Sequence, residues 1–272
     1  MTIVSLLVTG QVFSQAITDN GTNVGIGNAS PIHKLDVNGD INMSTGNALL
    51  IGGNQVVSTG GSRNMFLGDG TGTNITTGGD NAVIGFKAAE QLTEGRFNTI
   101  IGFKAAQNMT TSLSNTIIGR EAGKNSTGNQ NVLIGRQAGE NAEGGENTAI
   151  GDRAGLGITT GSSNTLIGKD ANVSSGTLIN ATAIGAGAVA GADNTVILGS
   201  GARVGIGTSV PNTKLHVHDA SLAYASFSTD QTGSLGFTDG LLVGTQYNGD
   251  AFIYNYENSP IKFATNAIER MT

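Results

Sequence analysis

The sequence predicts an all-β protein whose central part is a parallel β-solenoid, and two observations lead to this fold class. A five-residue phrase, NTIIG, begins at Asn98 and again at Asn115, and close variants follow at Asn131, Asn147 and Asn164. The chain also has 43 glycines but only 3 prolines among its 272 residues. A phrase that returns about every 17 residues suits one turn of a stacked β-structure and is too short for a helical-hairpin repeat.

The composition argues against several other classes of protein. Glycine does not occupy every third position and proline is scarce, so the chain is not collagen-like. Regularly placed isoleucine, leucine and valine argue against disorder. The formal net charge of −6 argues against a nucleic-acid partner, since such proteins need a basic surface. No apolar run reaches the roughly 18 residues of a membrane span, and without cysteine there are no disulfides or thiolate ligands.

The first 16 residues, MTIVSLLVTGQVFSQA, are apolar and end in small side chains, as the end of a secretory signal does. No lysine or arginine precedes the apolar stretch, so an apolar first strand is the alternative. We expect a signal peptide or leader over residues 1–16, followed by an N-terminal connector and β segment over 17–62.

The repeat occupies residues 63–203 and is expected to form about nine coils of 14–17 residues. We interpret the isoleucine before each glycine as the strand residue that faces a narrow interior, and the alanine three residues after the glycine as a turn with little room. Glycine allows a bend that a Cβ would hinder, and the asparagines that open the phrases can stack their amides in a ladder. The central glycines are Gly85, Gly102, Gly119, Gly135, Gly151 and Gly168, preceded by Ile84, Ile101, Ile118, Ile134, Ile150 and Ile167.

The repeat resembles those of known fibrous proteins. The stretch ATAIGAGAVAGADNTVILGSGA, from Ala181, resembles the head repeats of trimeric autotransporter adhesins of the YadA type. The longer form NTAIGDRAGLGITTGSS, from Asn147, resembles repeats of bacterial surface proteins and phage tail fibres that end in an endosialidase-type intramolecular chaperone. The resemblance implies a left-handed parallel β-roll in which three chains associate as a homotrimeric fibre.

Two stretches outside the repeat echo each other. NVGIGNASPIHKLDVNGDI, from Asn23, returns 180 residues later as RVGIGTSVPNTKLHVHDA, from Arg203. This element resembles the connector that precedes fibre modules in the chaperone-tailed proteins. We therefore expect a second connector over 204–219 and a small C-terminal β fibre module over 220–272.

The second connector contains the only pair of closely spaced histidines. His216 and His218 would point to one face of a strand, and a threefold axis could bring six imidazoles together around a metal ion. The matching residues of the first connector are Asp36 and Asn38. The alternative is therefore a solvent-facing edge without metal.

Cations and aromatic side chains are the candidates for receptor or glycan binding. A cation follows most repeat glycines, and Phe86, Phe103 and Lys104 are candidate glycan-binding residues at one end of this series. The alternative is a solvated edge, because Glu121, Asp152 and Asp170 are interleaved with the cations. Near the C-terminus, Tyr247, Tyr254 and Tyr256 lie close to Phe252; they pack the small module or present ring faces to sugars. The cations are Lys87, Lys104, Arg120, Arg136, Arg153 and Lys169.

These features predict a non-enzymatic, extracellular, homotrimeric fibre, secreted or on a bacterial surface, that attaches to a cell-surface glycan or receptor. The alternative is a tail fibre of a phage or a phage-like contractile injection particle, which recognises the host. A fragment of a fibre-borne glycan hydrolase is a third reading, but it would need two carboxylates about 5–9 Å apart in a cleft. The sequence predicts no catalytic residue and no cofactor. GREAGKNS at Gly119 lacks the spacing of a phosphate-binding loop.

Overall fold

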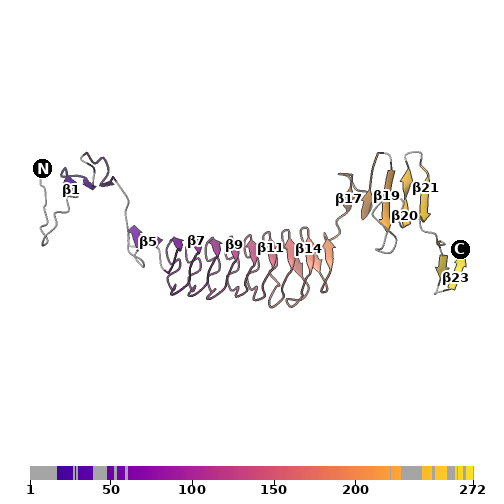
Figure 1. The fold of residues 1–272 in the computed structure, drawn as a ribbon, viewed down its shortest axis with the longest axis horizontal. Coiled ribbons are helices and arrows are strands. Elements are labelled where there is room, and N and C mark those ends of the chain that lie inside the picture. Colours follow the sequence, from indigo (N-terminus) through magenta and orange to yellow (C-terminus); the bar gives the residue numbers. More distant parts are fainter. Residues whose placement is uncertain are drawn as a thin grey trace. The chain divides into compact units, whose positions relative to one another are not determined.

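The computed structural model describes residues 17–26, 28, 30–38, 48–51, 54–58, 61–220, 222–227, 241–246, 249–255, 261, 263–265 and 268–271. Within these residues every regular element is a β-strand, and the central part is a parallel β-solenoid of about eight turns (Figure 1), which confirms the predicted fold class. The expected leader, residues 1–16, lies outside the described residues. The chain divides into two compact units, residues 1–129 and 130–272.

In the first unit, a small sheet precedes the solenoid. Strand β1 pairs antiparallel with β2, which pairs parallel with β3, and β5 pairs antiparallel with both β4 and β6. From β6 to β9, each strand is parallel to the one before it. The strands are β1 (Ile17–Asp19), β2 (Val24–Ile26), β3 (Leu35–Val37), β4 (Ala48–Ile51), β5 (Asn54–Ser58), β6 (Met65–Leu67), β7 (Ala82–Ile84), β8 (Thr99–Ile101) and β9 (Thr116–Ile118).

In the second unit, the solenoid strands β10, β11, β12, β14 and β16 pair parallel in that order, and β13 pairs with β15. Three small sheets follow: β17 with β18, the antiparallel β19–β20–β21, and β22 with β23. The strands are β10 (Val132–Ile134), β11 (Thr148–Ile150), β12 (Thr165–Ile167), β13 (Asn172–Val173), β14 (Thr182–Ile184), β15 (Val189–Ala190), β16 (Val196–Leu198), β17 (Val204–Ile206), β18 (Leu215–Val217), β19 (Leu222–Phe227), β20 (Leu241–Gln246), β21 (Ala251–Asn255), β22 (Phe263–Thr265) and β23 (Ile268–Met271).

The interior of the solenoid is lined by the middle residue of each strand, and here the sequence-based interpretation is wrong. In β8, Ile100 is fully buried, whereas Ile101 is 37% exposed. Side chains alternate between the two faces of a strand, so a buried Ile100 turns Ile101 outward. The isoleucines predicted to face inward are Ile84, Ile101, Ile118, Ile134, Ile150 and Ile167, and each is half-buried or exposed. The residues that fill the interior are Phe66, Val83, Ile100 and Ile117 in the first unit and Leu133, Ala149, Leu166 and Ala183 in the second.

The predicted asparagine ladder is confirmed inside each unit. The side-chain oxygen of Asn81 accepts hydrogen bonds from the backbone N–H and the side-chain amide of Asn98, both at 3.0 Å. The amide of Asn98 also donates to the carbonyl of Ser112 at 2.9 Å. The ladder therefore satisfies backbone groups at the turn where each coil enters its strand, and the asparagines are buried.

The repeat glycines and alanines occupy the turn after each strand, as expected. Gly102 has φ of 143°, and a Cβ there would meet the backbone carbonyl of Gly119 in the next coil. Ala88, Ala105 and Ala122 are fully buried behind this turn, as are Ala138, Ala154, Ala171 and Ala188 in the second unit. The turn after the strand thus needs small residues because successive coils stack backbone on backbone.

The two connectors have the same structure as well as similar sequences. Val24 pairs with Leu35 in the first connector, and Val204 pairs with Leu215 in the second. The amine of Lys34 donates to the carbonyl of Thr22 at 2.9 Å. Lys214 makes a similar bond at 2.8 Å, but to the carbonyl of Gly201, one residue before the position that corresponds to Thr22. The same three-residue parallel pairing therefore recurs in each connector, with a lysine amine bound to a nearby carbonyl in both.

Candidate binding surfaces

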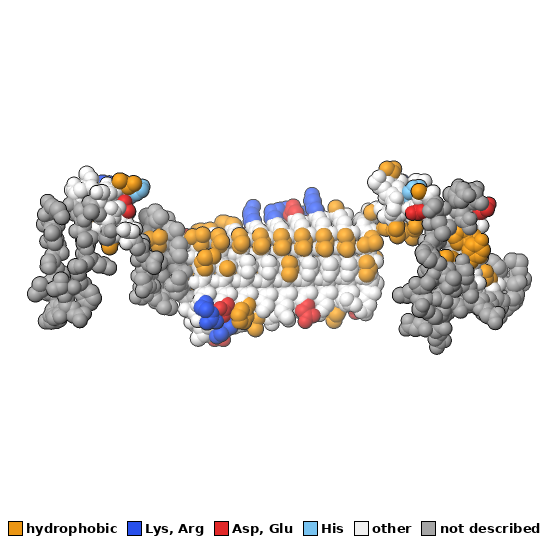
Figure 2. All heavy atoms as spheres, turned by 45° about the horizontal axis from the view of Figure 1, so that its top comes forward, with side chains coloured by type: hydrophobic (Ala, Val, Ile, Leu, Met, Phe, Trp, Pro, Cys, Tyr) orange, Lys and Arg blue, Asp and Glu red, His pale blue; other side chains and the backbone are white. Residues whose placement is uncertain are grey.

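The outer face of the solenoid strands carries two columns of β-branched or apolar side chains, one on each side of the buried middle residue. In β8 these are Thr99 and Ile101, and both are exposed. Figure 2 shows hydrophobic side chains in a row along the solenoid. We call the residues before the repeat glycines the outer stripe. It consists of Leu67, Ile84, Ile101 and Ile118 in the first unit and Ile134, Ile150, Ile167, Ile184 and Leu198 in the second.

The turn that follows each repeat glycine forms one edge beside the outer stripe, here named the glycine edge. In the first unit it carries Phe86 and Phe103, both 42% exposed, with ring centroids 5.6 Å apart and planes 15° apart. The guanidinium of Arg120 lies 5.9 Å from the Phe103 centroid, and the Lys104 amine lies 5.3 Å from it. The facing π-surfaces of these rings contact each other, and both cations also lie close to Phe103. A sugar would therefore meet mainly ring edges rather than the open faces that the sequence-based hypothesis needs.

The charges beside these rings are partly neutralised within the chain. The amine of Lys87 lies 2.9 Å from a carboxylate oxygen of Glu90, and the amide of Gln107 donates to the other oxygen at 2.6 Å. The hydrogen bond from Gln107, followed by that from Lys87, lowers the pKa of Glu90 below its ordinary value. Glu90 is therefore held ionised beside the cations.

The glycine edge of the second unit is a ladder of ion pairs between coils. Arg136 lies 2.9 Å from Asp152, and Arg153 lies 3.2 Å from Asp170. Lys169 differs, because it forms no ion pair with any described residue. The interpretation of the cations as a solvated edge neutralised by its own carboxylates therefore fits Arg136 and Arg153. It does not account for Lys169.

The opposite edge, here named the asparagine edge, is the turn before each buried asparagine, and the sequence reasoning missed it. In the first unit Arg63 binds Asp80 through two hydrogen bonds, one of them 2.8 Å long, which lowers the pKa of Asp80. Phe97 occupies the next place in this column with φ of 58° and is 61% exposed. A bulky aromatic side chain is uncommon in the left-handed region. The signal that could have revealed it is one aromatic residue in a column of otherwise polar ones.

The histidines of the second connector have a structural role that the sequence did not predict. The backbone N–H of Asn212 donates to Nδ1 of His216 at 3.4 Å, just as the N–H of Ile32 donates to Asp36 at 3.2 Å. A neutral imidazole that accepts at Nδ1 carries its proton on Nε2 and has no free lone pair there for a metal. Within the described residues, no group of three or more histidine or carboxylate side chains could hold a metal ion. A metal site at His216 and His218 that three copies share stays a prediction.

The aromatic candidates near the C-terminus are only partly described. Phe252 and Tyr254 lie on one face of β21 with ring centroids 4.8 Å apart, and Tyr254 is 47% exposed. Tyr247 and Tyr256 lie outside the described residues. The structure therefore brings one of the three predicted tyrosines into an exposed aromatic pair.

The chain matches no protein-family model, no curated protein and no solved structure. The resemblance to YadA-type head repeats, and the left-handedness that it implies, therefore stay predictions. Among the described residues, no helix is long and apolar enough to cross a membrane. The functional argument rests on the geometry of the surfaces above.

Proposed function

We propose that the chain is a non-enzymatic, extracellular fibre subunit that associates as a homotrimer and displays an adhesive surface to a cell-surface glycan or receptor. The single observation that carries this proposal is the outer stripe. The middle residue of each strand already fills the interior, so the stripe residues contribute nothing to it. A column of four apolar side chains in the first unit and one of five in the second are costly to leave in water, and a second and third copy of the same face would cover them.

We propose a trimer rather than a dimer because of the shape of the surface around the outer stripe. The stripe is narrow and is flanked by polar, charged edges, so it suits the centre of a closed ring better than one broad, flat contact. Three parallel copies would bury three stripes around one axis and leave the edges at the periphery of each contact. Such an assembly would also turn weak individual contacts with a receptor into useful avidity.

Adhesion is assigned to the C-terminal module rather than to the solenoid. Stacked coils present similar small residues again and again, which suits spacing better than specific binding. Tyr254, which is exposed and stacks on the half-buried Phe252, differs from the small repeated residues and would offer an aromatic surface to a sugar ring. A host-recognising tail fibre would use the same surfaces, so the two readings differ in biological setting and not in mechanism.

Two measurements test the proposal. Sedimentation equilibrium of the full chain should give three times the chain mass of 27.5 kDa, and a folded monomer would overturn the fibre reading. A glycan array or cell-binding assay should then compare the full chain with a form that ends at Asp219. Loss of binding in the shorter form is expected, whereas equal binding would move recognition to the solenoid edges.

A further inference from the structure

In the first unit, both edges of the solenoid carry charged side chains that form no ion pair among the described residues. On the glycine edge, Lys104 lies over Phe103 and forms no ion pair with any described residue. Glu94, in the bend that leads to Phe97 on the asparagine edge, is exposed and also forms none within the described part of the chain. Both residues belong to the coil that contains β8, so a cation and an anion lie at the same level on different sides of one strand.

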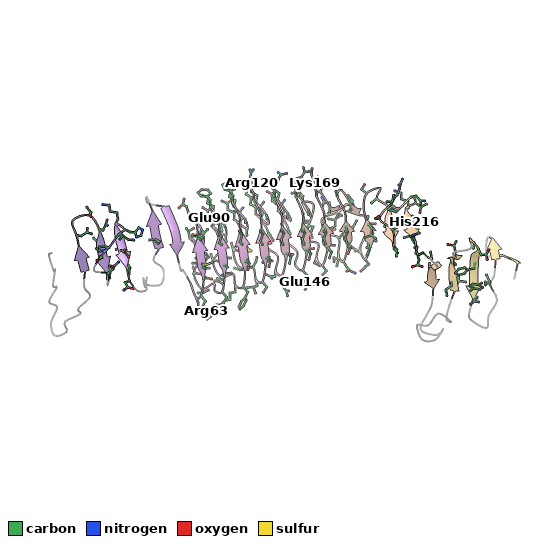
Figure 3. The ribbon with its side chains drawn as sticks, turned by 90° about the horizontal axis from the view of Figure 1, so that it is seen from above. Arg63, Glu90, Arg120, Glu146, Lys169 and His216 are labelled. Carbon is green, nitrogen blue, oxygen red and sulfur yellow. The ribbon has the colours of Figure 1, made fainter. Side chains whose placement is uncertain are left out.

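The second unit also carries, on each edge, a charged side chain that forms no ion pair within the described residues. Lys169 on the glycine edge has no carboxylate partner among the described residues. Glu146 on the asparagine edge bonds to the hydroxyl of Ser163 at 3.0 Å and has no cation partner there either. Figure 3 shows Lys169 and Glu146 on opposite sides of the solenoid. In the second unit Lys169 and Glu146 thus place a positive charge after the glycine and a negative one before the asparagine, whereas the first unit is mixed, because Arg96 before Asn98 and Asp69 after Gly68 also form no ion pair among the described residues.

Apolar side chains show a matching division. Phe97, on the asparagine edge, is largely exposed in a left-handed conformation, and Leu113 beside this edge is 41% exposed. Phe103, on the glycine edge, follows the same strand β8. The left-handed backbone belongs to the repeat, since Asp80, Ser114 and Glu146 in the same column also have positive φ, but packing within the described chain does not explain the exposed ring of Phe97.

We propose that copies of this chain dock edge to edge in one direction, with the glycine edge of each copy against the asparagine edge of the next. This inference rests on the proposed homotrimer and names the contact that closes it. A twofold axis perpendicular to the solenoid would make the copies antiparallel and place each edge against itself, which brings like charges together, whereas a rotation axis parallel to the solenoid joins the two different edges of parallel copies. Opposite charges across such a contact fix the direction and register of association.

The positions of these residues along the solenoid axis fit parallel copies that are not shifted relative to one another along that axis. The contact between Glu146 and Ser163 carries the glutamate toward the coil of β12, and Lys169 follows β12 directly. In the first unit, Phe97 and Phe103 flank β8 and would meet at one level. In antiparallel copies neither Glu146 and Lys169 nor Phe97 and Phe103 would lie at the same position along the axis. The proposal therefore also predicts that all chains of the fibre are parallel.

The absence of cysteine from the sequence allows a direct cross-linking test on the full chain. Lysine and glutamate side chains are long, so the Cα atoms of a Lys–Glu contact lie further apart than a disulfide permits. The double variant Glu146→Cys with Lys169→Cys should therefore be treated with a short bis-maleimide. Because the two positions lie on opposite edges, the linker cannot join them within one chain, and a covalent trimer is expected on denaturing gels.

Three controls keep the outcome decisive. Each single cysteine variant should remain at single-chain mass, and so should the pair Arg136→Cys with Lys169→Cys, which lies on one edge only. A cross-linked dimer from either single variant would overturn the directional contact. Charge reversal gives an independent reading: Lys169→Glu and Glu146→Lys should each lower the midpoint of trimer dissociation, and the double reversal should restore it.

The failures of the two proposals are distinguishable. If the wild-type chain sediments as a trimer but the Glu146/Lys169 pair gives no covalent trimer and the reversals change nothing, the edge contact is wrong and the trimer stands. If the wild-type chain is a monomer, both proposals fail together.

Discussion

Ile100 and Ile101 are neighbours in β8 with the same side chain, yet they lie in opposite environments. Ile100 is fully buried in the interior of its own coil, whereas Ile101 points outward and is 37% exposed. The same contrast recurs between Ile117 and Ile118. The inner column packs within one chain, and the proposal assigns the outer column to contacts between copies.

The two columns also differ in how variable they are, and packing explains the difference. In the second unit, Leu133 is followed in its coil by Ala142, and Ala149 by Ile158, all fully buried. In these two coils a large residue on one side of the interior is matched by a small one on the other, which keeps their summed volume similar; in the first unit Ile100 and Met109 are both large. The outer column has no partner in its own coil that could compensate, and it stays isoleucine or leucine throughout.

The largest expected effect comes from placing a charge in the inner column. Ile100→Asp should destabilise the fold by about 4 kcal/mol or more, because a buried carboxylate without a partner loses its hydration. Thermal unfolding followed by far-ultraviolet circular dichroism measures the loss. Ile101→Asp is the matched control and should keep a folded coil; equal unfolding by both would mean that the two columns do not differ in role.

Removal of one rung of the buried asparagine ladder should have an intermediate effect. Asn98→Ala removes the side-chain amide that donates to the Asn81 oxygen and to the Ser112 carbonyl, and the side-chain oxygen that accepts from the N–H of Asn115. The Asn81 oxygen keeps its bond from the backbone N–H of residue 98. The expected cost is about 2–3 kcal/mol, since unsatisfied buried polar groups keep their desolvation penalty.

Chemical denaturation of the Asn98 variant should be compared with Asn108→Ala. Asn108 donates to Asn125 in an exposed ladder at 2.7 Å, and its loss should cost less than about 0.5 kcal/mol. A similar cost for both would show that burial does not separate the two ladders.

The sequence was sufficient to predict the coil but not the direction in which its side chains point. The spacing of Gly85, Gly102 and Gly119 marks where backbones stack, and the asparagines mark where each coil turns. The inward direction was misread because Ile100 and Ile101 are equally apolar, so hydrophobicity alone cannot separate them. Thr99 is the residue from which the direction could have been inferred. If polar Thr99 points outward, the alternation of side chains along a strand directs Asn98 and Ile100 inward.

The edges were only partly accessible to sequence reasoning for a different reason. Phe86, Phe103 and Lys104 were recognised as a group, but the 15° angle between the stacked rings depends on the exact rise between coils. Phe97 could have been noticed as the one aromatic residue in a polar column of the repeat, but its exposure of 61% is visible only in three dimensions. Sequence reasoning also could not show that Asp36 and His216 both accept a hydrogen bond from a backbone N–H four residues earlier. A carboxylate and an imidazole have little in common except a lone pair.

The smallest expected effect concerns pH and the outer charges. Because hydrogen bonds from Gln107 and Lys87 lower the pKa of Glu90 in the folded chain, ionised Glu90 favours folding above the unfolded pKa of about 4.3. This contribution is lost as the pH falls through the lower folded value. Glu90→Gln should therefore flatten the loss of stability below about pH 4, as measured by urea denaturation across pH. An unchanged pH profile would contradict the role of Glu90.

The central claim is that the outer stripe joins copies while the inner column holds each copy, and the mass of one variant tests it most directly. Sedimentation equilibrium should be run on the full chain and on the double variant Ile101→Asp with Ile118→Asp, with circular dichroism on the same samples. We expect a trimer for the wild-type chain and a folded monomer for the variant, because two carboxylates on the stripe would have to be buried between copies. A variant that remains trimeric and as stable as the wild type would contradict the claim.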